Sequence, residues 1–148
     1  MLNKVTILAF DLDDTLWPCM PVIQHAEETL YAWLDQNYSR ITEKHNPQQL
    51  VDLRKQFTAQ DKRYSVDLSM MRYEFLKQLA TDNEYDASEV ADKGFDVFYN
   101  ARQEVSFYDD VFPALDRLSS KYRLGAITNG NANVEKVGLG HWIEHTVS

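Results

Sequence analysis

Three carboxylates and a hydroxyl lie within five consecutive residues near the start of the chain, in Asp11-Leu12-Asp13-Asp14-Thr15. Carboxylates this close repel one another, and a divalent metal ion is the simplest compensation. A carboxylate can also attack a phosphate ester and form an acyl phosphate. Asp11 is the best placed for that attack, and Asp13 could protonate the leaving oxygen and then take a proton from the water that cleaves the intermediate. The cluster therefore predicts phosphoryl-transfer chemistry, with magnesium as the ion that suits such oxygen ligands.

A second polar group, Thr128-Asn129-Gly130, follows a short apolar run later in the chain. The Thr128 hydroxyl could donate to a phosphoryl oxygen, with Asn129 and backbone amides beside it. Gly130, together with Leu12 between the two aspartates, completes the candidate phosphate-binding positions. Taken alone, a strand followed by Asn-Gly is most often a turn, so this group gains its meaning from Asp11.

Two apolar runs lead into these polar groups and are typical of strands. The run Val5–Phe10 is rich in β-branched residues and predicts a first strand that is buried on both faces of a parallel sheet. Residues 123–127 predict a second buried strand, and residues 141–148 could begin a third. Because open α/β sheets gather their ligands at the carboxyl ends of the strands, both polar groups are expected at the ligand-binding edge.

The chain between the two strands is predicted to be helical. Pro21 opens a segment in which apolar residues recur at helical spacing as far as Leu34. Asn46 and Pro47 supply an N-cap and a first-turn proline for the next helix. A further apolar stripe over residues 70–79 predicts another.

Two later helices are predicted from their caps. Asp86, with Glu89 three residues on, forms a capping-box pattern for a helix that continues to about Arg102. Asp109 can cap a helix whose first turn accommodates Pro113. The order of strand, helical block, helix and strand indicates an α/β core interrupted by an all-α unit.

The pair of motifs in this order resembles the haloacid dehalogenase superfamily. A hydrophobic strand that ends in DxDxT, here residues 11–15, resembles its first motif, and residues 126–130 resemble its second. The resemblance implies that Asp11 is the nucleophile and a metal ligand. It also implies that Asp13 is the acid/base and binds the metal through its backbone carbonyl, and that Thr128 orients the phosphoryl group.

The same resemblance implies the domain plan. We expect a partial Rossmann-like core of parallel strands, formed by residues 1–17 and 106–148, with an inserted all-α helical-bundle cap over residues 18–105. In this family the cap closes over the site and selects the substrate. The stretch Trp17–Pro21 is expected to be the hinge into the cap, stiffened by its two prolines.

Asp13 separates the activities within the family, because dehalogenases lack this second aspartate. A phosphatase or phosphomutase that acts on a small phosphorylated metabolite is therefore expected. Residues 11–17 and 127–132 look most like the bacterial branch that acts on flavin mononucleotide and related ribityl phosphates.

Two further motifs of the family have no counterpart after Thr128: a lysine that neutralises the phosphoryl group and a late acidic pair that completes the metal site. Lys136 is expected on a helix after the second strand and does not match the motif lysine. The sequence thus predicts a truncated chain with little activity of its own, unless a partner completes it as a dimer or by strand swapping. The alternative is a non-catalytic binding or interaction protein built on the same fold.

The composition disfavours several kinds of partner. The 148 residues are 44% hydrophobic and 26% charged, and the formal net charge of -8 with a pI of about 4.9 argues against duplex DNA and acidic membranes. The run Val5–Phe10 is too short for a signal-peptide core or a membrane span. The single cysteine, Cys19, excludes an internal disulfide, so a cytoplasmic protein is expected.

Two other classes of site fit less well. An EF-hand loop that starts at Asp11 would need glycine where Leu16 stands and glutamate where Val22 stands. A phosphorylation-receiver domain is disfavoured because a long helical insert follows the first strand.

Overall fold

A computed structural model describes residues 5–147, which form three strands and seven helices in two compact units. One unit contains the residues up to Ile23 together with those from Arg102 onward, and the other is Gln24–Ala101. The sequence predicts a wider insert, residues 18–105, and that domain boundary stays a prediction. In chain order the elements are β1 (Ile7–Phe10), α1 (Cys19–Asn37), α2 (Ser39–Thr42), α3 (Pro47–Thr58), α4 (Lys62–Val66), α5 (Leu68–Asp82), α6 (Ala87–Ala101), α7 (Val111–Ser119), β2 (Arg123–Ile127) and β3 (Ile143–Val147).

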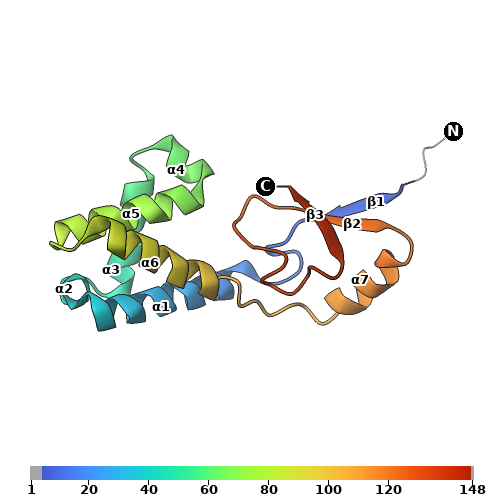
Figure 1. Ribbon diagram of the computed structural model, residues 1–148, viewed down its shortest axis with the longest axis horizontal. Helices are drawn as coiled ribbons and strands as arrows, with labels where there is room; N and C mark the ends of the chain where they lie inside the picture. Colours follow the sequence, from blue (N-terminus) through green and yellow to red (C-terminus); the bar gives the residue numbers. More distant parts are fainter. Residues whose placement is uncertain (1–4, 148) are drawn as a thin grey trace. The chain divides into compact units, whose positions relative to one another are not determined.

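The first unit is built on a parallel sheet in the order β1-β2-β3 (Figure 1). Leu8 of β1 pairs with Leu124 of β2, and Leu124 pairs in turn with Ile143 of β3. Because the strands are parallel and adjacent, the loops after β1 and β2 leave the same edge of the sheet. The predicted α/β fold with parallel strands and an all-helical insert is confirmed, including the third strand.

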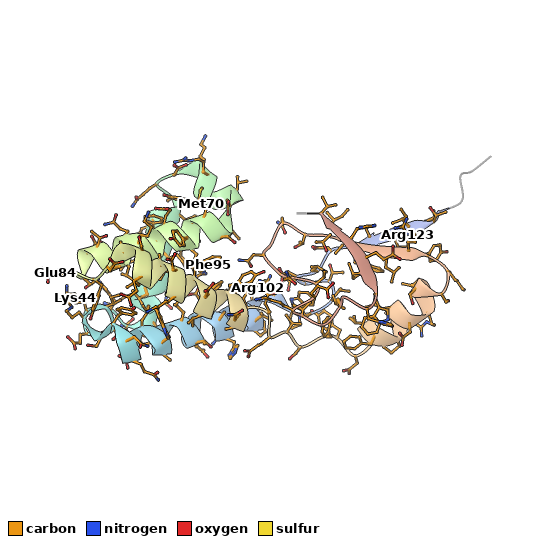
Figure 2. The ribbon with its side chains drawn as sticks, viewed as in Figure 1. Lys44, Met70, Glu84, Phe95, Arg102 and Arg123 are labelled. Atoms are coloured by element: carbon orange, nitrogen blue, oxygen red, sulfur yellow. The ribbon has the colours of Figure 1, made fainter. Side chains whose placement is uncertain are left out.

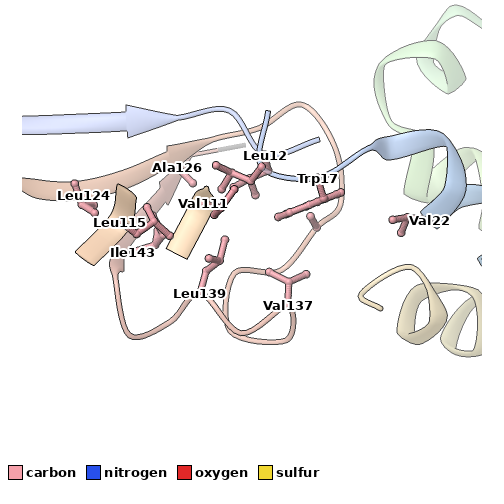
Figure 3. Close-up of a cluster of buried hydrophobic side chains, with 12 residues drawn as sticks. Leu12, Trp17, Val22, Val111, Leu115, Leu124, Ala126, Val137, Leu139 and Ile143 are labelled. Atoms are coloured by element: carbon pink, nitrogen blue, oxygen red, sulfur yellow. The ribbon is translucent and has the colours of Figure 1, made fainter. Parts of the chain in front are cut away.

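One face of the sheet carries the core of this unit. Figure 3 shows its buried side chains gathered where strand residues meet α7 and the loop after β1. The cluster comprises Leu12, Leu16, Trp17, Val22, Val111, Leu115, Leu124, Ala126, Ala132, Val137, Leu139 and Ile143. Burying this apolar surface is the main stabilising contribution, and it fixes the loop after β1 through three of the loop's own residues.

The opposite face exposes apolar side chains, so the prediction that β1 is buried on both faces was wrong. Exposure alternates along β1, and Ile7 is 57% exposed. Ile127 and Val147, on β2 and β3, are 58% and 62% exposed. The physical reason is that, among the described residues, the core packs against one face alone.

The segment predicted as a hinge, Trp17–Pro21, is largely helical. The first helix begins at Cys19, whose backbone N–H donates to Asp14 Oδ1 at 2.8 Å. Pro21 therefore lies within the first turn rather than opening it. A proline is tolerated there because the first N–H groups of a helix have no intrahelical partner.

The predicted caps are confirmed for two helices. Asn46 and Gln49 form a reciprocal capping box at the start of α3, with Pro47 in the first turn. Asp86 Oδ1 accepts from the Glu89 backbone N–H at 2.7 Å, at the start of α6.

The cap predicted for α7 was wrong. The N-cap residue is Asp110 rather than Asp109, and it makes no side-chain capping hydrogen bond. Its backbone is already in the helical region, where an N-cap side chain does not reach back to the first turn.

The helical unit is organised around α1, α5 and α6. A β-carbon on Gly94 of α6 would lie 3.2 Å from both Leu76 of α5 and Trp33 of α1, so the three helices meet where α6 has no side chain. Arg72 of α5 is buried, pairs with Glu27 of α1 at 2.8 Å and lies 3.3 Å from the ring centroid of Phe98. Figure 2 shows the dense side chains of this unit.

Across residues 5–147, none of the helices combines the length and the apolar character that crossing a membrane requires.

Candidate active site

The loop after β1 is held by its apolar residues. Leu12, Leu16 and Trp17 are 0%, 5% and 0% exposed. The backbone N–H of Thr15 and that of Leu16 both donate to the Leu12 carbonyl, at 3.1 and 2.8 Å, which closes one tight turn. Asp14 completes it with a φ of 61°, a left-handed conformation that aspartate tolerates better than most residues. The buried residues therefore lie between and after the aspartates and fix the loop that carries them.

Asp11 follows β1 directly and is exposed. Its Oδ1 accepts from the Leu12 backbone N–H at 2.8 Å. Leu12 was predicted to bind phosphate, and only its backbone could do so because its side chain is fully buried. That N–H already bonds to the proposed nucleophile, so it orients the Asp11 carboxylate.

Both oxygens of the Asp13 carboxylate accept hydrogen bonds. Trp17 Nε1 donates to Oδ1 at 2.9 Å, and Arg102 Nη2 donates to Oδ2 in a close ion pair. The side chain of Asp13 is 18% exposed and that of Arg102 is 1% exposed. Asp13 is thus held at the boundary between the core and solvent, and its charged partner, Arg102, is buried.

Arg102 is anchored further by the loop after β2. Its Nε donates to Asn131 Oδ1 at 2.7 Å, whereas its Nη1 is buried without a hydrogen-bond partner. The next residue, Gln103, donates to the Asn131 carbonyl at 3.2 Å and accepts from the Asn133 backbone N–H at 2.8 Å. Residues 102 and 103 therefore tie the chain after α6 to the loop that follows β2.

Gly130 lies beside Asp13, and the Thr128 side chain lies beside Gly130. A β-carbon on Gly130 would be 2.7 Å from Asp13 Oδ2, 3.4 Å from Arg102 Nη2 and 3.5 Å from Thr128 Oγ1. The Thr128 side chain accepts from the Gly130 backbone N–H at 3.0 Å, which leaves its O–H as a donor. The two motifs predicted to share a site are therefore in contact. Asn129, which lies between Thr128 and Gly130 in the sequence, is exposed.

The charges of Asp13 and Arg102 also act on the Cys19 thiol. Partial burial raises the pKa of the Cys19 thiol, and the nearby negative charge of Asp13 raises this pKa further. The Arg102 guanidinium acts in the opposite direction. Cys19 is therefore held mainly as the unreactive thiol.

The comparison with protein families matches residues 5–147 to the haloacid dehalogenase-like hydrolases. The chain belongs to this family. It is 30% identical over 146 residues to the Escherichia coli (strain K12) protein 5-amino-6-(5-phospho-D-ribitylamino)uracil phosphatase YigB. That alignment covers 97% of this chain and 61% of the relative, so the chain spans about three-fifths of that protein.

Solved structures show the fold of this haloacid dehalogenase-like chain independently. A 2-haloacid dehalogenase from Pseudomonas syringae pv. Tomato DC3000 matches with a TM-score of 0.86 and 32% identity, over 97% of this chain and 64% of that one. The HAD-hydrolase YfnB from Bacillus subtilis matches with a TM-score of 0.56 and 15% identity, over 97% of this chain and 63% of that one. The Escherichia coli relative is thus named for a dephosphorylation and the Pseudomonas syringae relative for a dehalogenation.

Haloacid dehalogenase-like phosphatases generally use magnesium, and the described residues fit only part of such a site. Between residues 5 and 147, no group of three or more His, Cys, Asp or Glu side chains could hold a metal ion. The Asp11 carboxylate and the Asp13 carbonyl would offer two oxygens, but the Asp13 carboxylate faces a guanidinium. Magnesium requires near-octahedral oxygen coordination, which these two oxygens supply only in part.

Sequence reasoning missed the partners of Asp13 in this haloacid dehalogenase-like site. Arg102 was expected at the end of a helix in the insert, 89 positions away from Asp13. Nothing in the sequence marked it as buried, since arginine is mostly exposed. Lys136, expected on a helix, lies in a turn that is capped by Asn133 Oδ1.

Proposed function

We propose that this chain carries the nucleophile and the acid/base of a phosphohydrolase that acts on small phosphorylated metabolites. The observation that supports this best is the contact between the two motifs, where Gly130 lies against the Asp13 carboxylate and donates its backbone N–H to the Thr128 side chain. A dehalogenase has no use for a second carboxylate that delivers a proton to a leaving alkoxide. A hydrolase of phosphate monoesters requires one.

In the first proposed step, an Asp11 carboxylate oxygen attacks phosphorus and the bond from phosphorus to the ester oxygen breaks. For this step Asp13 must start as the carboxylic acid; it gives its proton to the departing oxygen, so the alcohol leaves neutral and Asp13 becomes a carboxylate. Water then attacks the aspartyl phosphate, Asp13 takes a proton from that water, and the bond between Asp11 and phosphorus breaks. Inorganic phosphate leaves and both aspartates return to their starting states.

Thr128 is proposed to orient the phosphoryl group through its remaining O–H donor. The Leu12 N–H keeps Asp11 in place at 2.8 Å, so the nucleophile is oriented before the substrate arrives. Asn129 and Gly130 are proposed to offer backbone N–H groups, although the Gly130 N–H already donates to Thr128. Magnesium enters the proposal only as an ion held weakly by Asp11 and the Asp13 carbonyl.

The substrate class belongs to the same proposal. The Escherichia coli relative is named for a ribitylamino-uracil phosphate, and residues 11–17 and 127–132 look like the branch that acts on flavin mononucleotide and ribityl phosphates. A phosphorylated ribityl chain is therefore the first substrate class to test. The helical insert would close over it and select it, and a cytoplasmic location would fit such a metabolite.

A second candidate function is a non-catalytic binding protein. It is favoured by one observation: both oxygens of the proposed acid/base are already occupied, by Trp17 Nε1 and Arg102 Nη2. In that case the site binds a phosphorylated ligand and does not turn it over.

Turnover of a panel of phosphate esters that includes flavin mononucleotide, measured on the purified chain, tests the proposal. Asp11→Asn and Asp13→Asn are the test variants, and Asp109→Asn changes an exposed carboxylate of the same unit as a control. Turnover in the unchanged chain and in Asp109→Asn, with its loss in Asp11→Asn, would support a phosphohydrolase. A folded chain that binds these esters without turnover would favour the binding protein. If active chains sediment as dimers, a second copy supplies what the described residues lack.

A further inference from the structure

Arg102 is a buried cation at the junction of three segments. Its guanidinium reaches Asp13 in the loop after β1 through Nη2 and Asn131 in the loop after β2 through Nε. The residue itself directly follows α6. Arg102 belongs to the unit that also contains Arg123, and both are labelled in Figure 2.

Burying a guanidinium is costly unless its charge is paired and its donors are satisfied. At 1% exposure, Arg102 has one carboxylate partner, Asp13, and its Nη1 makes no hydrogen bond. Apolar residues in place of both Arg102 and Asp13 would avoid these costs. Stability alone therefore does not account for an arginine at this position.

The geometry points to Arg102 as the positioning residue of Asp13, an inference that rests on the proposed acid/base role of that carboxylate. The guanidinium holds one oxygen of this carboxylate, Oδ2, through Nη2 in a charge-assisted hydrogen bond. Trp17 Nε1 holds the other oxygen at 2.9 Å. Between them, the indole and the guanidinium leave the Asp13 carboxylate a single orientation.

Two neighbours support this role of Arg102. A β-carbon at Gly130 would collide with Asp13 Oδ2. Because Gly130 has none, the Asp13–Arg102 pair can lie directly against the second motif. Asn131 holds Nε at 2.7 Å and thereby sets the plane of the guanidinium. Arg102 thus acts through Asp13 and does not need to touch the substrate.

The Trp17 indole reports on the position of Asp13 whether or not the chain turns over a substrate. In Arg102→Gln and the milder Arg102→Lys, we expect the Trp17 indole N–H signal to shift and its hydrogen exchange to accelerate roughly five- to tenfold, the loss of about one hydrogen bond. Trp142 is an internal control, because its Nε1 donates to a different carboxylate, Asp116, in the same unit.

The control variant is Arg123→Gln, which removes an exposed arginine of the same unit that pairs with Glu144. It should leave the Trp17 indole unchanged. An unmoved Trp17 indole in a folded Arg102 variant would overturn the inference, and so would equal changes at Trp17 and Trp142, which indicate a merely structural anchor. If neither Arg102 variant folds, Asn131→Ala removes only the acceptor of Arg102 Nε, and this variant must still shift the Trp17 indole N–H signal.

Turnover provides the second readout where the chain is active. Arg102→Gln should lower kcat by roughly 100-fold with little change in KM, the effect of a misplaced catalytic group. In an Asp13→Asn background, Arg102→Gln should not lower kcat any further, because Arg102 acts by positioning Asp13. Additive losses would overturn the inference. An unchanged chain without turnover contradicts the proposed function instead, and the indole readout still decides the role of Arg102.

Discussion

Gly130 approaches Asp13 so closely that a β-carbon on the glycine would lie 2.7 Å from the carboxylate oxygen that pairs with Arg102. Real β-carbons essentially never come so near to another atom. The neighbour cannot yield easily, because Asp13 is held at both oxygens. The absence of a side chain at Gly130 is therefore what lets the two motifs meet.

Gly130→Ala is expected to displace Asp13 and to lower the free energy of unfolding by about 1–3 kcal/mol. Chemical denaturation of the purified chain measures this loss. Gly140→Ala is the matched control, because the atoms nearest to its β-carbon would be those of the flexible Glu135 carboxylate, which is exposed and can move. Equal effects of the two substitutions would contradict the close approach.

The Cys19 thiol should alkylate more slowly in the folded chain than a free thiol does at the same pH. Its pKa is raised by burial and then by the Asp13 charge, so less thiolate is present near neutral pH. Asp13→Asn removes that charge and should speed alkylation by iodoacetamide, whereas Asp109→Asn should not. Alkylation in Asp13→Asn that is no faster than in the unchanged chain would contradict an effect of the Asp13 charge on Cys19.

The same raised pKa of Cys19 sets the sign of its pH dependence. The unfolded chain releases the thiol proton at a lower pH than the folded chain. The contribution of the thiol to stability is therefore complete below the ordinary pKa of a thiol and is lost as the pH rises through the higher folded pKa. Unfolding measured across the alkaline range with Cys19→Ser as the reference should show this loss.

The helical unit depends on a buried ion pair. Arg72 is 6% exposed and its pKa is lowered, mainly by burial, while Glu27 compensates. Glu27→Gln should lower the free energy of unfolding by about 3 kcal/mol, because it leaves a buried guanidinium without its counter-charge. Glu84→Gln changes a pair whose carboxylate side chain is 88% exposed and should cost less than about 1 kcal/mol.

Magnesium should bind this chain poorly. Because the described residues offer only the Asp11 carboxylate and the Asp13 backbone carbonyl, millimolar magnesium is expected to leave the Tm unchanged, since an ion far below its Kd adds no stability. Thermal unfolding with and without a chelator measures this, and Asp11→Asn is the reference. A rise in Tm that disappears in Asp11→Asn would mean that the site has more magnesium ligands than the two oxygens named here.

Local signals in the sequence predicted much of the fold. Residues 123–127 form the predicted strand because they are apolar and bounded by turn residues. The cap of α3 followed from Asn46 and Pro47, whose conformational preferences act locally. The short helix α4 was not predicted, because its five residues are too few to show an apolar period.

The site was predicted only as far as local motifs reach. The contact between Asp13 and Gly130 follows from two strand ends at one edge of a parallel sheet, which the sequence indicates. The contact between Asp13 and Arg102 depends on how the chain after α6 returns to the loops, and no spacing rule encodes it. The half-exposed β1 was likewise out of reach, because burial depends on what the fold places over each face.

Detection of a phosphate bound covalently to Asp11 tests the central claim most directly. The chain is mixed with a small acyl phosphate or flavin mononucleotide, quenched in acid and digested, and the peptide that contains Asp11 is weighed by mass spectrometry. We expect phosphate on Asp11 in the unchanged chain and none in Asp11→Asn. With the acyl phosphate, whose leaving carboxylate needs no proton, Asp13→Asn should carry more phosphate because its hydrolysis is slowed. Phosphate ester hydrolysis that continues undiminished in Asp11→Asn would contradict it.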